Sequence, residues 1–368
     1  MAKLSLAVFF GGRSGEHEVS LMSARSVLGA LDQDKYQVYQ VGITHDGDWL
    51  TGEDVIGAFE RGDTNSLDAV TLLPEPSDRG MYVRGEGDSL SKLAELDVAV
   101  PILHGPYGED GTIQGLFEMA DLAYVGAGVL ASAVAMDKGL FKWLMRAHHI
   151  PVLDFTVISK GTFENDMDAA LNAAEAVADY PLFTKPANMG SSVGVRKVHS
   201  RSDLVEGLMD AAQYDRRILV ERGIEAREIE VSVLGNEKPD ASVPGEVIPS
   251  DEYYSYRAKY IDDRSELHIP APIDYERAEE ARGMAIEAYK VIDGEGMARV
   301  DLLMEKDTDQ LYLNEVNTIP GFTSISMYPK LWEASGLPYP ELMDRLIELA
   351  QARKVQKDGL VRTYEGAA

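Results

Sequence analysis

The chain has 368 residues, of which 45% are hydrophobic and 26% charged, a composition typical of a globular enzyme with two or three domains. Its formal net charge of −27 argues against general binding to nucleic acid or to anionic membranes. The absence of cysteine excludes disulfides, thiolate metal sites and a cysteine nucleophile.

The N-terminal segment and the apolar stretches indicate the cellular location of the protein. Met1 leads directly into a strand-like run without the apolar core and small-residue cleavage site of a secretory signal. The longest weakly polar stretch, residues 125–136, is too short to span a bilayer. We therefore expect a soluble, cytoplasmic protein with no membrane partner.

The first hundred residues predict the start of a parallel α/β sheet. Residues 4–10 form a strand-like run, a glycine-rich loop and a helix over 16–31 follow, and 36–43 is the next strand. Residues 98–103 form another apolar strand. The polar, Gly-rich residues 60–92 indicate a β-hairpin insertion or loops, to which we assign little function.

The remainder of the chain alternates between strand and helix patterns. An Ala-rich helix is expected to follow Gly126 and to continue to about His149. Further strands are expected at 182–185, 218–221, 228–234 and 241–248, the last two forming a pair, and further helices over 278–288 and 338–350, with a frayed tail after Lys354.

Two apolar segments near the C-terminus flank a polar turn around Thr308 and predict a β-hairpin. If the turn centres on Thr308, Asp301 faces Glu315 and Arg299 faces Asn317. Facing carboxylates repel each other, and a hard divalent cation such as Mg²⁺ would remove that penalty. A solvated acidic hairpin is the alternative that these residues leave open.

The segment from Lys185 to Val195 holds two glycines and two serines between strand-like runs. Backbone N–H groups in such a loop can bind phosphate, and Lys185 adds positive charge. The Walker A spacing is absent, so the chain is not a P-loop enzyme. A plain hairpin turn is the alternative.

Other candidate positions follow strands or open helices. Gly11 and residues 104–111 each follow a predicted strand. The loops at such strand ends bind ligands in α/β proteins. For residues 104–111, a simple Gly-Pro turn is the alternative. Glu16 suits the first turn of a helix and needs no other purpose there. The tyrosine-rich residues 253–260 precede a polar segment and indicate a lid over a reaction site, with simple packing as the alternative.

Two further residues are ambiguous on their own. Lys138 reads as a solvated lysine on its helix or as a fixed cation. Glu221 closes an apolar strand and Ile224 follows three residues later. That pattern suits a linker that holds an adenine, but it is common in unrelated proteins.

Taken together, seven motifs in order resemble the D-alanine–D-alanine ligases of the ATP-grasp superfamily over nearly the whole chain. The seven motifs are GGRSGEHEVS at 11–20, HGPYGEDGTIQG at 104–115, MDK at 136–138, KPANMGSSVG at 185–194, and the segments 221–228, 256–260 and 314–324.

The resemblance implies a fold that combines α/β and α+β parts, the three-domain ATP-grasp fold. A parallel α/β domain over 1–137 would supply much of the first amino-acid site. A central domain over 138–220 and a C-terminal domain over 221–368 would clasp ATP between their sheets. The C-terminal domain would also carry the metal site and the lid loop.

The resemblance also implies which residues bind the nucleotide and the metal ions. Lys138 and Lys185 would contact the phosphates, while Lys259 would reach the γ-phosphate from the lid. Two Mg²⁺ or Mn²⁺ ions are the implied cofactors, and K⁺ is a further candidate. The implied nucleotide-binding residues are Lys138, Lys185, Ser192, Glu221, Ile224, Glu228 and Lys259, and the implied metal ligands are Asp301, Glu315 and Asn317.

For the amino-acid substrates, the resemblance places Glu16 on the ammonium of the first D-alanine, with Ser191 and Tyr260 linked to it by hydrogen bonds that close the lid. Charge that develops during the reaction would lie near Arg299 and the backbone amide of Gly321. The implied residues in contact with substrate are His104 and Ser326.

The implied activity is the ATP-dependent joining of two D-alanine molecules through a D-alanyl phosphate, for peptidoglycan precursor synthesis, by an enzyme expected to be a homodimer. Tyr260, in the sequence Tyr-x-Ala-Lys-Tyr, resembles the dipeptide-forming branch of the family. A D-alanine–D-lactate or D-alanine–D-serine ligase is the nearest alternative. An ATP-binding protein without turnover is an alternative of another class.

Overall fold

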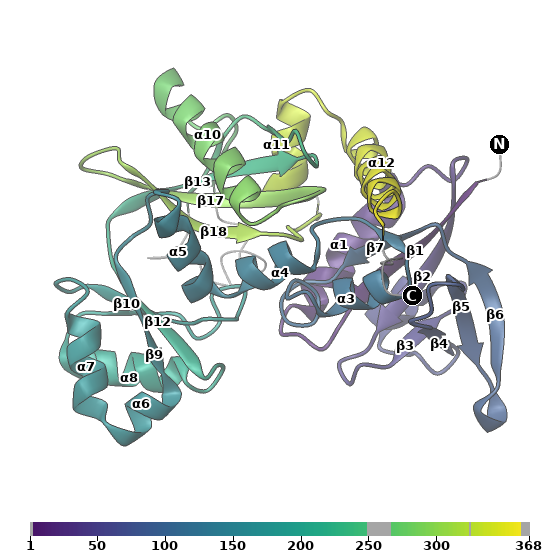
Figure 1. Ribbon diagram of the computed structural model, residues 1–368, viewed down its shortest axis with the longest axis horizontal. Coiled ribbons are helices and arrows are strands. Elements are labelled where there is room, and N and C mark those ends of the chain that lie inside the picture. The colour runs from purple at the N-terminus through teal and green to yellow at the C-terminus, as the bar shows by residue number, and fades with distance from the viewer. Residues whose placement is uncertain (1–2, 249–265, 324, 362–368) are drawn as a thin grey trace, which may run out of the picture.

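The computed structural model describes residues 3–248, 266–323 and 325–361, which form three β-sheets, each covered by helices (Figure 1). The sheets follow one another along the chain. The first lies on the right of Figure 1, the second at the lower left and the third at the top. Among the described residues, no helix is long and apolar enough to cross a membrane.

The N-terminal sheet has eight strands in the order β6-β5-β4-β3-β2-β1-β7-β8. Its parallel half comprises β1 (Leu4–Gly11), β2 (Tyr36–Ile43), β7 (Val98–Ile102) and β8 (Ala123–Tyr124). Its antiparallel half comprises β3 (Trp49–Thr51), β4 (Asp68–Leu72), β5 (Gly80–Arg84) and β6 (Leu90–Glu95). The helices of this region are α1 (His17–Ala30), α2 (Val55–Arg61), η1 (Glu86–Asp88) and α3 (Thr112–Met119).

The N-terminal sheet is therefore mixed, since the expected parallel strands make up only half of it and the other half is antiparallel. β1 and β2 can lie parallel because α1 carries the chain back between them, whereas β4, β5 and β6 follow one another through turns that reverse the chain. The hairpin insertion predicted within residues 60–92 is confirmed: β4 pairs with β5 there.

The predicted Ala-rich helix to His149 is two helices, α4 (Val129–Met136) and α5 (Lys138–Ala147). Asp137 separates them with an extended backbone, φ −85° and ψ 96°, and its side chain accepts a hydrogen bond from the backbone N–H of Leu140 at 2.9 Å. This N-cap starts a new helix, so Lys138 lies in the first turn of α5.

The central sheet is antiparallel, in the order β11-β10-β12-β9. Leu182 and Val220 from the sheet are buried with Leu204 and Leu208 from a helix, which fixes the helical layer on one face. The elements are β9 (Phe155–Ser159), α6 (Lys160–Asn165), α7 (Met167–Glu175), β10 (Leu182–Pro186), β11 (Arg196–Val198), α8 (Arg201–Ala211) and β12 (Arg217–Arg222).

The third sheet follows the order β16-β15-β13-β17-β18, with β14 beside β13. The predicted pairing of residues 228–234 with 241–248 is confirmed, since Glu228 faces Val247. The elements are β13 (Ala226–Leu234), β14 (Asp240–Ala241), β15 (Gly245–Ile248), β16 (Glu266–His268), α10 (Tyr275–Val291), β17 (Met297–Glu305), β18 (Leu311–Asn317) and α11 (Met327–Ala334).

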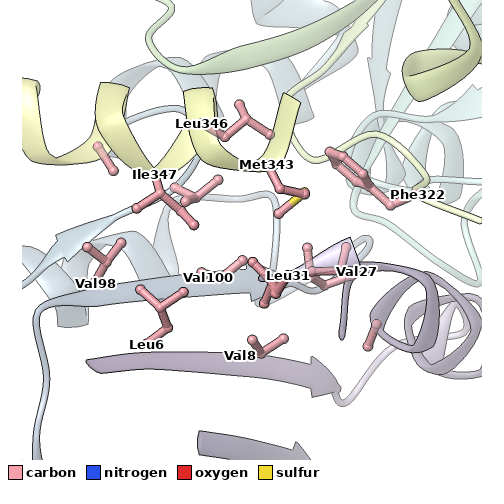
Figure 2. Close-up of a cluster of buried hydrophobic side chains, with 14 of the residues drawn as sticks. Leu6, Val8, Val27, Leu31, Val98, Val100, Phe322, Met343, Leu346 and Ile347 are labelled. Carbon is pink, nitrogen blue, oxygen red and sulfur yellow. The ribbon is translucent and has the colours of Figure 1, made fainter. Parts of the chain in front are cut away.

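The last helix, α12 (Tyr339–Asp358), returns to the N-terminal sheet (Figure 1). It runs past the predicted end at residue 350, and the chain after Lys354 continues as helix to Asp358 rather than fraying. Figure 2 shows Leu346 and Ile347 of this helix above Val98 and Val100 of β7, all within one buried cluster.

Candidate active site

The hairpin of β17 and β18 brings the expected side chains together. Asp301 faces Glu315 and Arg299 faces Asn317, as predicted. The register shifts between Asp301 and Leu302, because Asn314 is an extra residue in β18. This bulge aligns the carboxylates although the turn does not centre on Thr308.

Each of the two carboxylates on the hairpin lies beside a positive or amide group. Arg299 Nη2 lies 2.6 Å from Asp301 Oδ2, and Asn317 Nδ2 donates a hydrogen bond to the same oxygen at 3.0 Å. Lys138 Nζ, from the start of α5, lies 3.4 Å from Glu315 Oε2. The hairpin is therefore a concentrated charge cluster on neighbouring strands, not a solvated acidic turn.

The donor set of this hairpin suits a hard divalent cation. Asp301 and Glu315 offer carboxylate oxygens from facing positions, and Asp301 is only 9% exposed. Rotation of the Asn317 amide would bring its carbonyl oxygen toward the same point. Carboxylate and amide oxygens are the ligands that Mg²⁺ and Mn²⁺ prefer, so these residues fit the implied metal ions.

A cavity of about 500 Å³ lies between the central sheet and the third sheet. Its volume is within the range of small-molecule binding sites. Residues from β10, β12, β13, β17 and β18 contribute to its walls. The predicted site residues that line it are Lys138, Lys185, Ser191, Ser192, Glu221, Ile224, Glu228, Asp301 and Glu315.

Glu221 anchors a buried charge cluster at this cavity. Its Oε2 lies 2.8 Å from Lys185 Nζ and its Oε1 lies 2.5 Å from Lys142 Nζ, with Lys142 and Glu221 each 1% exposed. Burial opposes ionisation of Glu221, but the two lysines outweigh it and hold the pKa of the carboxyl below its usual value. Burial lowers the pKa of Lys142.

The loop after β10 closes one end of the cavity in a strained conformation. Ser191 and Ser192 both have positive φ, 47° and 58°, and Lys138 Nζ donates a hydrogen bond to the Met189 carbonyl at 2.8 Å. Successive residues with such dihedrals turn backbone N–H groups toward one point and can bind an anion. The loop geometry thus agrees with a phosphate contact.

Glu16 connects this loop to the N-terminal sheet. Ser191 Oγ donates a hydrogen bond to Glu16 Oε1, the contact that the family resemblance implies. Glu16 is 7% exposed and lies just before α1. A Cβ added at Gly190 would lie 2.4 Å from Glu16 Oε2, and one at Gly105 would lie 2.5 Å from it. A side chain at either position would displace the Glu16 carboxylate, and the positive φ of Gly105, 73°, also favours glycine there.

Glu109 is a second buried carboxylate beside Glu16. It accepts hydrogen bonds from the backbone N–H of Gly105 at 2.8 Å and of Ile319 at 3.1 Å. Burial, together with the charge of Glu16, raises the pKa of Glu109 to about 8. Glu109 therefore ties the loop after β7 to the loop after β18.

His104 makes a parallel connection through both ring nitrogens. Nδ1 lies 3.0 Å from the Ile319 carbonyl, so it donates, and Nε2 accepts from Ser23 Oγ at 3.1 Å. Burial lowers the pKa of His104. Both nitrogens are engaged by the protein, so His104 positions the loop after β18.

Gly321 and Ser326 lie together in that loop. A Cβ added at Gly321 would lie 2.7 Å from Ser326 Oγ, which accepts a hydrogen bond from the Thr323 backbone N–H at 3.0 Å. Two of the predicted site residues, Lys259 and Tyr260, lie outside the described residues.

The cavity of about 500 Å³ and the Glu16 region meet at a small cavity of about 30 Å³. Its lining includes Glu109 and Gly190 from one side and Lys138, Glu315 and Asn317 from the other. The predicted residues that line these two cavities therefore form one continuous site, to which Glu16 is joined through its hydrogen bond with Ser191.

Sequence reasoning missed several charged residues of this site, among them Lys142, Glu230 and Glu109. Lys142 follows Lys138 by four residues and shares its helix face, a signal that was available. Glu230 follows Glu228 on the same face of β13, and its Oε2 lies 3.1 Å from Arg299 Nε. Glu109 lies within the singled-out segment 104–111, but nothing in that segment indicates its burial.

Two family models match the chain: D-ala D-ala ligase N-terminus over residues 5–127 and D-ala D-ala ligase C-terminus over residues 144–348. The D-alanine–D-alanine ligase of Thermoanaerobacter sp. (strain X514) is 52% identical over 352 residues, covering 95% of this chain and 97% of the relative. The solved structure of the D-alanine–D-alanine ligase from Coxiella burnetii is 35% identical with a TM-score of 0.81, covering 99% of each chain. The VanG D-Ala:D-Ser ligase from Enterococcus faecalis is 33% identical with a TM-score of 0.84, covering 95% of this chain and 100% of that structure.

Proposed function

The chain belongs to the D-alanine–D-alanine ligase family, and we propose that it joins two D-alanine molecules at the expense of ATP, through a D-alanyl phosphate. The observation that carries the proposal is the continuous site in which a cavity of about 500 Å³ meets the Asp301–Glu315 pair and, beyond it, the Glu16 region. The product serves peptidoglycan precursor synthesis.

ATP occupies the larger cavity in this proposal. Lys138, Lys185 and the loop at Ser192 bind the phosphates, because they supply two ammonium groups and a strained backbone loop at the cavity wall. Glu221 and Ile224 border the adenine, and Glu228 accepts hydrogen bonds from the ribose. Lys259 reaches the γ-phosphate from the lid.

In the proposal, Asp301, Glu315 and Asn317 would hold two Mg²⁺ or Mn²⁺ ions, and K⁺ is a further candidate activator. When bound, the divalent ions neutralise charge on the phosphate oxygens. Arg299 is held beside Asp301 at 2.6 Å, which aims its guanidinium at the same region. Preorganised cations of this kind stabilise charge that develops in the transition state.

The first D-alanine lies at Glu16, which binds its ammonium, while its carboxylate attacks the γ-phosphorus of ATP and releases ADP. The amine of the second D-alanine then attacks the carbonyl carbon of the D-alanyl phosphate. The tetrahedral intermediate expels phosphate and leaves the dipeptide. Arg299 and the backbone N–H of Gly321 stabilise the oxyanion.

The remaining predicted residues hold the substrates in place. Ser191 fixes Glu16 through their hydrogen bond and, with Tyr260, closes the lid. Ser326 binds the carboxylate of the second D-alanine. His104 does not need to contact the second D-alanine directly. Its hydrogen bond to the Ile319 carbonyl oxygen positions the loop that forms that substrate's site.

We also propose three domains, over 1–137, 138–220 and 221–368, with α12 returning to the first of them. The site uses residues from all three, so each domain is needed for activity. We place the reaction in the cytoplasm, where ATP is available, and propose a homodimer.

A D-alanine–D-serine ligase is the second candidate, because the VanG structure, whose title names that activity, superposes with a TM-score of 0.84. The D-alanine–D-alanine ligase from Thermoanaerobacter is more similar in sequence, at 52% identity against 33%. This difference favours D-alanine as the second substrate.

The test is an assay of dipeptide and phosphate formation from MgATP with D-alanine alone, and with D-serine or D-lactate as competitor. We expect phosphate release to require D-alanine and D-alanyl-D-alanine to be the main product. Phosphate release that is indifferent to D-alanine overturns the proposal. Preferential formation of D-alanyl-D-serine or D-alanyl-D-lactate selects the alternative ligases.

A further inference from the structure

A group of metal-ligating side chains lies outside the ATP cavity, at the carboxyl edge of the N-terminal sheet. In the described part of the chain, one group of three histidine or acidic side chains brings a ligand atom from each within 4.8 Å of the others: His17, Glu18 and His45. His17 and Glu18 open α1, and His45 follows β2. β1 and β2 pair in parallel with Gly11 facing Ile43, so the loops after these strands meet at one edge.

The tautomer of His17 is set by the backbone. Its Nδ1 lies 2.9 Å from the Gly12 carbonyl oxygen, which can only accept, so Nδ1 carries the proton. The lone pair is then on Nε2. Metal-binding histidines are held in this way, by a hydrogen bond from the second ring nitrogen to a carbonyl. His17 is 5% exposed, and burial lowers its pKa, which keeps the ring neutral at pH 7.

His45 and Glu18 complete the group from the solvent side. The His17 and His45 rings are stacked with centroids 3.8 Å apart at 25°. His45 Nε2 lies 3.9 Å from Glu18 Oε1, too far for a hydrogen bond but short enough for two ligands of one metal ion after small rotations. Their side chains are 66% and 71% exposed, so both can rotate and a solvated ion can enter.

We propose that His17, Glu18 and His45 bind a transition-metal dication, with Zn²⁺ as the representative. Two imidazole nitrogens and one carboxylate oxygen suit Zn²⁺, Ni²⁺ or Cu²⁺, whereas Mg²⁺ prefers an all-oxygen set such as Asp301, Glu315 and Asn317. The site is therefore chemically distinct from the one in the ATP cavity. Solvent fills the remaining coordination positions because the group is open on one side.

Calorimetric titration of the full chain with Zn²⁺, in a large excess of MgCl₂, tests the proposal. The magnesium occupies the hard oxygen sites and suppresses general binding to the acidic surface. We expect one Zn²⁺ per chain. His45→Asn weakens that binding roughly tenfold or more and Glu18→Gln weakens it by a smaller factor. Both residues are exposed, so neither substitution disturbs the core.

The matched control is His199→Asn, which removes an exposed histidine after β11, in the central sheet. It should bind Zn²⁺ as the wild type does. Zn²⁺ binding that is unchanged in His45→Asn overturns the proposal, as does equal weakening in His199→Asn. The readout is metal binding and not dipeptide synthesis, so failure of the proposed ligase reaction would leave this test unaffected.

Discussion

At the scale of single residues, the buried Lys142–Glu221 pair lies beside the cavity that we propose for the nucleotide. Glu221 lies between two lysines, at 2.5 Å from Lys142 and 2.8 Å from Lys185. Lys142 is on the protein side of Glu221, while Lys185 lines the cavity. Lys142 therefore positions the carboxylate that borders the adenine in our proposal.

Replacing Lys142 by methionine should destabilise the fold by about 3 to 5 kcal/mol, because it leaves a buried carboxylate with one cation instead of two. The KM for ATP should rise as Glu221 moves toward Lys185. Urea unfolding and initial rates at varied ATP measure the two effects. Arg146→Met, on the same helix but 48% exposed, is the control. A Lys142→Met enzyme that matches this control in both measurements contradicts the positioning role.

Glu315 tests the prediction that the hairpin of β17 and β18 binds divalent metal ions. Glu315→Gln keeps the shape of the side chain and removes one of the two facing carboxylates. We expect kcat to fall about 100-fold and half-maximal activity to require more Mg²⁺. Glu305→Gln, on the same hairpin but outside the ATP cavity, should leave the Mg²⁺ dependence unchanged. Undiminished coupling by Glu315→Gln would mean that the hairpin does not hold the ions.

At the scale of elements, Glu109 joins the loop after β7 to the loop after β18, and its raised pKa makes the stability of the fold depend on pH. The folded-state pKa of about 8 is above the usual carboxyl value of 4.5, so the folded protein binds more protons than the unfolded chain between these pH values. The stabilisation is complete below about pH 4.5 and is lost as the pH rises through 8. The difference between these two pKa values corresponds to a loss of about 5 kcal/mol.

Urea unfolding of the wild type and of Glu109→Gln from pH 5 to 9 measures this effect. The wild type should lose stability more steeply with rising pH than the variant, which lacks the titrating group. Both chains share the general repulsion of an acidic protein, so only the difference in slope is informative. Parallel slopes would show that Glu109 is ionised throughout this range.

The elements also show what the sequence could and could not predict. The Asp301–Glu315 pairing followed from alternation along two strands and a polar turn, which are local features. The bulge at Asn314 compensates for a turn that is not centred where expected, and no local signal shows it. Of the antiparallel half of the first sheet, only the hairpin within residues 60–92 was predicted, because the direction of the other strands depends on connections that the sequence pattern does not show. Asp137 was a visible N-cap signal, but the apolar pattern continues on both sides of it.

At the scale of the whole molecule, α12 joins the two ends of the chain. Arg353, 3% exposed, donates to the carbonyl oxygens of Gly126 and Tyr124 at 2.6 and 2.8 Å. Phe322, from the loop that precedes α11, belongs to the same buried cluster as the α12 side chains in Figure 2. The loop that carries Gly321 is therefore anchored in the N-terminal core, and the amino-acid subsites that we propose depend on that docking.

Leu346→Ala tests the docking of α12. Leu346 is fully buried in the cluster of Figure 2, so its truncation should lower the free energy of unfolding by about 2 to 5 kcal/mol through lost burial and a cavity. Because α12 links the first sheet to the third, Trp49 in β3 and Trp332 in α11 should report one unfolding transition that shifts together. Val355→Ala, 71% exposed on the same helix, should change stability by less than about 0.5 kcal/mol. Two outcomes would contradict the docking role: equal stability of the two variants, or a shift of the unfolding transition at Trp332 without one at Trp49. Either would mean that α12 does not hold the N-terminal sheet against the rest of the enzyme.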